Sequence, residues 1–97
     1  MNILVVEDDP RISDVLEYAL KSDGHQVSLT QRGREGVDLA RSVEPALILL
    51  DVGLPDIDGF AICDRLKRNR ETNLIPIIIS GRQKRWHQSV SGPRGSL

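Results

Sequence analysis

Two short apolar runs, each followed at once by acidic residues, constrain the fold of this chain more than any other feature. The first covers residues 2–6 and is followed by Glu7 and Asp8, and the second covers residues 46–50 and ends in Asp51. Beyond their first residue, neither run alternates apolar with polar residues, which is typical of strands covered on both faces in a parallel sheet. The carboxyl ends of such strands form the edge where open α/β sheets bind ligands. If the two strands are neighbours, Glu7, Asp8 and Asp51 will therefore share one crevice.

The rest of the chain alternates strands with helices. Strands are predicted over residues 2–6, 26–30, 46–50 and 74–79, and helices from Asp9-Pro10 to Asp23-Gly24, over residues 34–42 and from Asp58 to about residue 71. Four such alternations imply right-handed crossovers and a doubly wound parallel α/β sheet. The strand at 26–30 does alternate apolar with polar residues, so we place it at a sheet edge.

Two of the acids that follow these runs, Asp9 and Asp51, have simpler structural explanations. Asp9 precedes Pro10, and an acid before proline is a common helix start, so Asp9 is explained as a cap. Asp51, followed by Gly53, could by itself be ordinary turn chemistry. Glu7 and Asp8 have no such explanation, and adjacent carboxylates at the end of a buried strand repel each other unless a cation compensates.

Composition excludes several classes of protein. No apolar stretch approaches the roughly 20 residues of a membrane span, and no signal peptide opens the chain, so a cytoplasmic location is expected. The single Cys63 cannot form an internal disulfide, and its apolar neighbours indicate an inert buried thiol. Residues 1–59 hold 12 of the 14 acids, whereas residues 60–97 hold 8 of the 13 bases. Clustered acids at strand ends favour a divalent cation.

A crevice with three carboxylates suits Mg²⁺, or Mn²⁺ in its place. Mg²⁺ prefers carboxylate oxygens and water and keeps positions open for phosphate. With a cation bound, one carboxylate can stay ionised and attack a phosphoryl group in line, while a nearby hydroxyl helps to offset charge on the phosphoryl oxygens. The product would be an acyl phosphate.

Three segments resemble the receiver domain of two-component response regulators. They are the first strand with its acids, residues 3–10; the loop that follows Asp51, residues 51–60; and the fourth strand, residues 75–80. The resemblance covers residues 1–81 and implies a flavodoxin-like doubly wound sheet. It further implies that Asp51 accepts phosphate from a sensor histidine kinase, and that Glu7, Asp8, Asp51 and the backbone carbonyl of Gly53 hold the metal. On this resemblance the chain is a signalling domain and not an enzyme, apart from self-phosphorylation by small phosphodonors and autodephosphorylation.

The sequence departs from that family in two places. The family's fourth strand ends in a hydroxyl five residues beyond its proline, whereas Ser80 lies four beyond Pro76. A one-residue slip turns a strand side chain to the opposite face, so either a local bulge restores the hydroxyl of Ser80 to the site or it is lost. The family also continues with a helix, a fifth strand carrying a lysine, and a last helix. Lys84 comes too early to be that lysine.

We therefore expect an incomplete sheet. Residues 1–81 form the receiver-like domain, and residues 82–97 form a tail outside the family pattern, with poor order and no DNA-binding output domain. Without a fifth strand, the strand ending at Ile79 has an unpaired edge, a template for pairing with another chain. We expect a homodimer through Ile77 and Ile79 or that edge, or else a marginally stable monomer.

Three other functions compete with the phosphoacceptor. A haloacid dehalogenase-type phosphatase also places an Asp after a parallel strand, but it needs a second Asp where this chain has Gly53. A receiver-like interaction module that no longer takes phosphate fits the missing lysine. Nucleic-acid binding by the basic tail would depend on Trp86 alone for stacking. Binding of Mg²⁺ and of acyl-phosphate analogues separates these alternatives.

Overall fold

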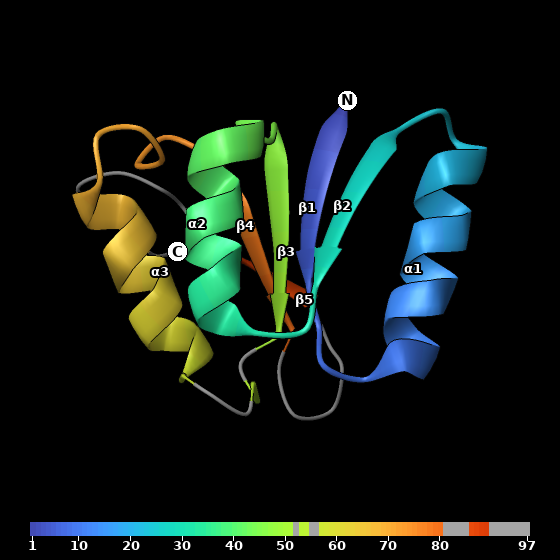
Figure 1. Cartoon of the computed structure of the whole chain (residues 1–97), viewed down its shortest axis with the longest axis horizontal. Helices are drawn as coiled ribbons and strands as arrows, with labels where there is room; N and C mark the ends of the chain where they lie inside the picture. The colour runs from blue at the N-terminus through green and yellow to red at the C-terminus, as the bar shows by residue number, and fades with distance from the viewer. Residues whose placement is uncertain (52, 55–56, 81–85, 90–97) are drawn as a thin grey trace.

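The computed structural model describes residues 1–51, 53–54, 57–80 and 86–89. They form one five-stranded sheet with three helices (Figure 1). The elements are β1 (Asn2–Val6), α1 (Pro10–Ser22), β2 (Gln26–Thr30), α2 (Gly33–Val43), β3 (Leu47–Asp51), α3 (Gly59–Arg68), β4 (Ile77–Ser80) and β5 (Trp86–Ser89). The strand order across the sheet is β2-β1-β3-β4-β5.

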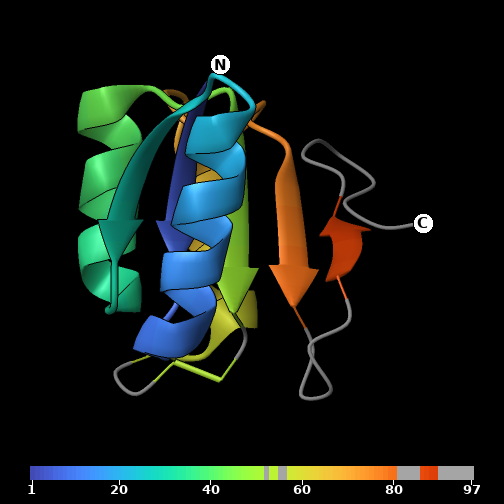
Figure 2. The same ribbon diagram turned by 90° about the vertical axis from the view of Figure 1, so that its right-hand side faces the viewer.

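The sheet is doubly wound, as the sequence predicts. Strands β1 to β4 are parallel, β1 lies between β2 and β3, and β2 is at one edge. Helix α1 covers one face of the sheet and α2 and α3 cover the other, and Figure 2 looks onto the α1 side. Among these three helices, none is both long enough and apolar enough to cross a membrane.

Two aliphatic cores lie on the two faces of the sheet. Because successive strand side chains point to opposite faces, Leu4 and Val6 enter the core under α2 and α3, whereas Ile3 and Val5 enter the core under α1. All four side chains are at most 2% exposed. The unalternating apolar run of β1 is therefore a strand covered on both faces, as predicted. Cys63 is buried in the first of these cores.

The helix starts follow the predicted capping chemistry. Asp9 caps α1, and its Oδ1 accepts a hydrogen bond from the backbone N–H of Arg11 at 2.9 Å. Pro10 is the first residue of this helix, where its missing N–H costs nothing. Asp58 caps α3 in the same way, accepting from the N–H of Phe60 at 3.3 Å.

Strand β4 begins three residues later than predicted. Leu74 lies in a turn and is 78% exposed, so it belongs to no strand. The turn is held by Thr72, whose buried hydroxyl donates to the carbonyl of Leu66 at 2.7 Å and whose carbonyl accepts from the N–H of Ile75 at 3.1 Å. The first bond ties the turn to the end of α3, and the second uses the N–H of Ile75, a residue that the apolar pattern assigned to the strand.

The structure also contains a strand that the sequence analysis did not predict. Trp86–Ser89 form β5, which pairs antiparallel with β4. Only five residues separate Ser80 from Trp86, too few for the crossover that a parallel strand needs, so an antiparallel partner is the one available. This corrects the expectation that the outer edge of β4 presents a row of unpaired backbone groups.

The expected dimer contact through Ile77 and Ile79 is wrong as well. Ile77 is 0% and Ile79 is 7% exposed, and both pack in the core under α2 and α3. Ile77 and Ile79 are apolar because they pack beneath α2 and α3 of their own chain. The division of the chain at residue 81 stays a prediction, since residues 81–85 and 90–97 lie outside the described ranges.

Two glycines of α2 allow that helix to lie close to its neighbours, and one of them gives a stability prediction. A Cβ added at Gly33 would lie 2.1 Å from Cδ1 of Ile62 and 2.4 Å from Cγ2 of Ile57, whereas one at Gly36 would lie 2.9 Å from Cγ2 of Val6. Gly33→Ala should therefore lower the free energy of unfolding by about 1–3 kcal/mol, the usual cost of overpacking, less the helix-propensity gain of alanine.

Denaturant titration measures this change, and a double variant identifies its cause. Ile62→Val removes the Cδ1 atom of the closest contact, so Gly33→Ala should cost less in that background than in the wild type. Equal costs in the two backgrounds, or a stabilising Gly33→Ala, would show that α2 does not depend on this close approach.

Candidate functional site

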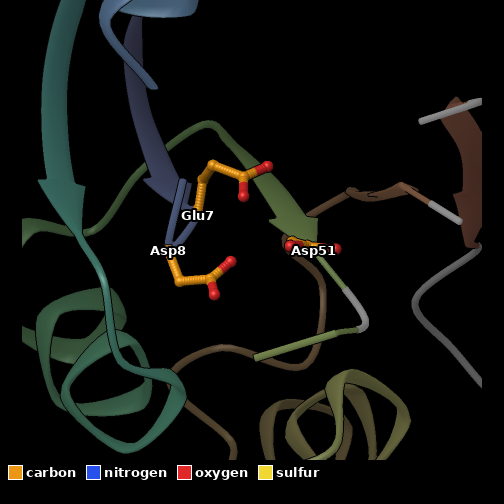
Figure 3. Close-up of side chains that lie close together, drawn as sticks. All are labelled: Glu7, Asp8 and Asp51. Carbon is orange, nitrogen blue, oxygen red and sulfur yellow. The ribbon is translucent and has the colours of Figure 1, made fainter. Parts of the chain in front are cut away.

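Three carboxylates meet at the carboxyl edge of the sheet. Glu7 and Asp8 directly follow β1, and Asp51 is the last residue of β3. The two strands are neighbours, and Val6 lies opposite Leu50 in the register. The residues that follow this pair are Glu7 and Asp51, so two acids come side by side. One carboxylate oxygen from each of the three residues lies within 4.8 Å of the others. Figure 3 shows Glu7 and Asp8 extending toward the side on which Asp51 lies.

Burial makes this arrangement electrostatically expensive. Glu7 is 1% and Asp51 is 4% exposed, whereas Asp8 is exposed to solvent. Burial disfavours ionised carboxylates, and like charges this close disfavour them further. A divalent cation among the three oxygens would reverse both effects, and three carboxylate oxygens are a donor set that Mg²⁺ and Mn²⁺ accept. The residues present therefore fit such an ion.

Backbone hydrogen bonds fix the two buried carboxylates. Oε2 of Glu7 accepts from the N–H of Asp9 at 3.1 Å, and Oδ1 of Asp51 accepts from the N–H of Gly53 at 3.1 Å. The site is therefore held in place by the chain segments that leave β1 and β3. Among the described residues, a Cβ added at Gly53 would meet only Oδ1 of Asp51, at an ordinary 3.8 Å.

Asp9, the third acid after β1, stabilises the start of α1. Its carboxylate caps α1 and forms an ion pair with Arg11, with Nη2 3.1 Å from Oδ2. This hydrogen bond, together with the charge of Asp9, raises the pKa of the exposed Arg11 guanidinium. The prediction that Asp9 has a capping role is confirmed.

Ser80 lies beside Asp51 across the sheet. The β3–β4 ladder runs from Ile48 opposite Ile77 to Asp51 opposite Ser80 without an interruption. Residues in register on parallel strands point to the same face, so Ser80 shares the face of Asp51, and it is fully buried. Because this ladder is uninterrupted, no bulge is needed to bring Ser80 there. The sequence left open whether the side chain of Ser80 faces the site, and the β3–β4 register places it on the face of Asp51.

Glu7 also lines a polar cleft, whose other residues were not among the predicted site residues. The cleft has a volume of about 430 Å³ and lies between the first turns of α1 and the end of β2. Thr30 ends β2 opposite Val6, and its hydroxyl donates to Oε1 of Glu35 at 2.5 Å. The signal in the sequence was the position of Thr30 at the carboxyl end of the strand predicted over residues 26–30.

Lys84, which the sequence analysis already set aside, lies outside the described residues. Of the lysines that the structure does describe, Lys21 is in the last turn of α1 and Lys67 is in the last turn of α3. These helices return antiparallel to the strands, so their last turns are at the opposite edge of the sheet from Asp51 (Figure 1). Within the described part of the chain, no lysine reaches the acidic site.

Comparison with known proteins decides the family. The sequence pattern described as the response regulator receiver domain matches residues 3–90. The chain belongs to the response regulator receiver family. It is thus a receiver domain of two-component systems, and its parallel α/β fold is that of the solved receiver structures. The haloacid dehalogenase alternative is set aside by this match.

Individual relatives agree with this assignment. The chain is 42% identical over 77 residues to the DNA-binding dual master transcriptional regulator RpaA of Synechocystis sp., covering 79% of this chain and 32% of that protein. It is 36% identical over 92 residues to Protein PilH of Pseudomonas aeruginosa, covering 95% of this chain and 76% of PilH. The chain thus spans about a third of the length of the first relative and three quarters of the second.

Solved structures of receivers include metal-bound examples. The receiver domain of a sensor histidine kinase from Pseudomonas aeruginosa PAO1, solved with magnesium coordinated in its active site cleft, superposes with a TM-score of 0.77 at 33% identity, over 80% of this chain and 64% of that one. A Mn²⁺-bound form of response regulator Rcp1 superposes with a TM-score of 0.70 at 27% identity, over 82% and 64%.

The geometry predicts weak, specific binding of a divalent cation. Titrating Mg²⁺ into the ¹⁵N-labelled chain should shift the backbone amide signals of Glu7, Asp8 and Gly53 and saturate at millimolar concentration. Asp8→Asn removes an exposed ligand from the cluster and should weaken binding by about tenfold, as loss of a metal's supporting group typically does.

A second substitution controls for net charge. Asp23→Asn removes one acid at the far end of α1 and should leave the affinity unchanged. Amide signals that do not move at millimolar metal in a folded sample would contradict the metal site.

Proposed function

We propose that Asp51 accepts a phosphoryl group from a sensor histidine kinase, at a divalent-metal site formed by Glu7, Asp8 and Asp51. The observation that carries the proposal is the approach of these three carboxylates to within 4.8 Å at the ligand-binding edge of the sheet. Asp51 is suited to be the nucleophile because it lies at a strand end, buried and oriented by the N–H of Gly53. The backbone carbonyl of Gly53 is proposed as a further metal ligand.

The reaction is an in-line displacement at phosphorus. A carboxylate oxygen of Asp51 forms the new P–O bond while the bond from phosphorus to the donor's imidazole nitrogen breaks, and the histidine keeps the electron pair and takes up a proton. Bound Mg²⁺ or Mn²⁺ would supply positive charge that offsets the charge of the phosphoryl oxygens. The side chains of Glu7 and Asp8 would hold that ion beside Asp51, and the Ser80 hydroxyl on the same sheet face could donate to a phosphoryl oxygen.

Small phosphodonors fit the same chemistry. With acetyl phosphate the P–O bond to the acetyl group breaks and acetate leaves, so no kinase is needed to test the acceptor. Receivers are signalling domains, and self-phosphorylation of this kind and the later hydrolysis of the acyl phosphate are the catalytic steps that we assign to this chain.

An interaction module that does not take phosphate is the second candidate, and one observation favours it. The resemblance implies a lysine on a parallel fifth strand that pairs with the phosphate. In this chain β5 is antiparallel, and no lysine among the described residues lies near Asp51. A receiver without this lysine would transfer the phosphoryl group slowly or not at all, even with its metal ligands unchanged.

Phosphorylation by acetyl phosphate decides between the two functions. In the presence of Mg²⁺, intact-mass spectrometry should show one added phosphoryl group on the wild type and none on Asp51→Asn, because an amide cannot act as the nucleophile. Asp38→Asn, which changes the same charge on the exposed side of α2, should be labelled like the wild type.

Two results would contradict the proposal in different ways. A label that persists on Asp51→Asn would move the acceptor to another residue. A wild type that binds Mg²⁺ but takes no label would contradict the phosphoacceptor and favour the interaction module.

A further inference from the structure

A second charged feature lies on the face of the molecule away from α1. A groove of about 390 Å³ runs between α2 and α3, which lie side by side in Figure 1. Four arginines line it: Arg34 and Arg41 from α2, and Arg65 and Arg68 from α3. All four are exposed, and the buried side chain of Val37 forms part of the lining between them.

Helical spacing places the arginines along the two sides of the groove. Arg34 and Arg41 are seven residues apart, or two turns, and therefore lie on one stripe of α2. Arg65 and Arg68 are three residues apart and share one stripe of α3. The α2 stripe faces the α3 stripe, because residues of both stripes line the same groove.

Acidic residues offset only part of this charge. Asp38 lies in the groove, one turn after Arg34, and Asp64 on α3 pairs with Arg68, with 3.0 Å between Nε and Oδ2. That pair is exposed, with side chains 60% or more accessible, so it constrains Arg68 weakly. Among the described residues that line the groove, arginines outnumber acids, in a chain whose net charge is −1 and whose other cluster is acidic.

Helix stability explains some of these arginines but not their convergence. Arg41, Arg65 and Arg68 are in the last turns of their helices, where the helix dipole favours cations. Arg34 is the second residue of α2, at the end where the dipole disfavours a cation. Four guanidinium groups that face one another across a groove also repel, and helix stability alone does not require them to converge.

We infer that the α2–α3 groove binds an acidic polypeptide segment of a partner protein. Guanidinium groups form bidentate hydrogen bonds with carboxylates, and two arginines on each side match a row of Asp or Glu side chains. Val37 offers an apolar contact for a side chain between the acids. The surface is separate from the acidic edge, so the inference does not depend on the proposed phosphoacceptor.

A nucleic acid fits the groove less well. None of the described residues that line it is aromatic, so it offers no surface for base stacking.

Titration of the full chain with a blocked hexaglutamate peptide tests the inference. Backbone amides of residues 34–41 and 65–69 should shift and saturate, and a hexaglutamine peptide should leave them unchanged. The double variant Arg41→Glu/Arg65→Glu should bind the peptide at least about tenfold more weakly, and raised salt should weaken wild-type binding.

A matched double variant controls for net charge. Lys21→Glu/Arg70→Glu changes the charge by the same amount outside the groove and should bind like the wild type. Equal loss in both variants, shifts that map elsewhere on the wild type, or no saturable shift would overturn the inference. Tighter binding of a single-stranded hexanucleotide than of hexaglutamate would overturn it in favour of nucleic acid.

Discussion

The parallel pairing of β1 with β3 is the constraint on which both the core and the site depend. Their side chains fill the two aliphatic cores, and the same register carries Glu7 and Asp51 to one edge. Two ionised carboxylates a few ångströms apart repel by roughly 3–4 kcal/mol at an effective dielectric constant of 20. The burial of the strands thus forces an unfavourable charge arrangement on the domain, which a bound cation can relieve.

The two charged regions of the molecule follow from the geometry of the fold. Helices in a parallel α/β sheet run back antiparallel to the strands, so acids that follow strands gather at one edge, while basic residues of the last helical turns lie toward the other. In this chain the acids meet at the end of β1 and β3, and three of the four groove arginines, Arg41, Arg65 and Arg68, are in the last turns of α2 and α3. One chain of nearly neutral net charge therefore presents an acidic cluster and an arginine-lined groove on separate surfaces.

Local signals in the sequence predicted most of the fold and the acidic cluster. The ends of β1 and β2, the caps at Asp9 and Asp58, and the meeting of the three carboxylates all followed from runs, caps and strand polarity. Long-range packing decided what could not be predicted. The β3–β4 register placed Ser80 beside Asp51, and helix packing rather than an open edge accounted for Ile77 and Ile79. The arginine groove could not be predicted either, because the sequence does not show that α2 lies next to α3.

The stability of Asp51→Asn, with and without Mg²⁺, tests the central claim that these carboxylates meet at a cost which a cation offsets. Asparagine keeps the oxygen that accepts from the N–H of Gly53 and removes only the charge. Without Mg²⁺, denaturant unfolding should show the variant to be more stable than the wild type by about 1–3 kcal/mol. Saturating Mg²⁺ should stabilise the wild type more than the variant and so shrink or reverse the difference. A variant that is less stable than the wild type in the absence of metal, with a difference that Mg²⁺ does not change, would contradict the account.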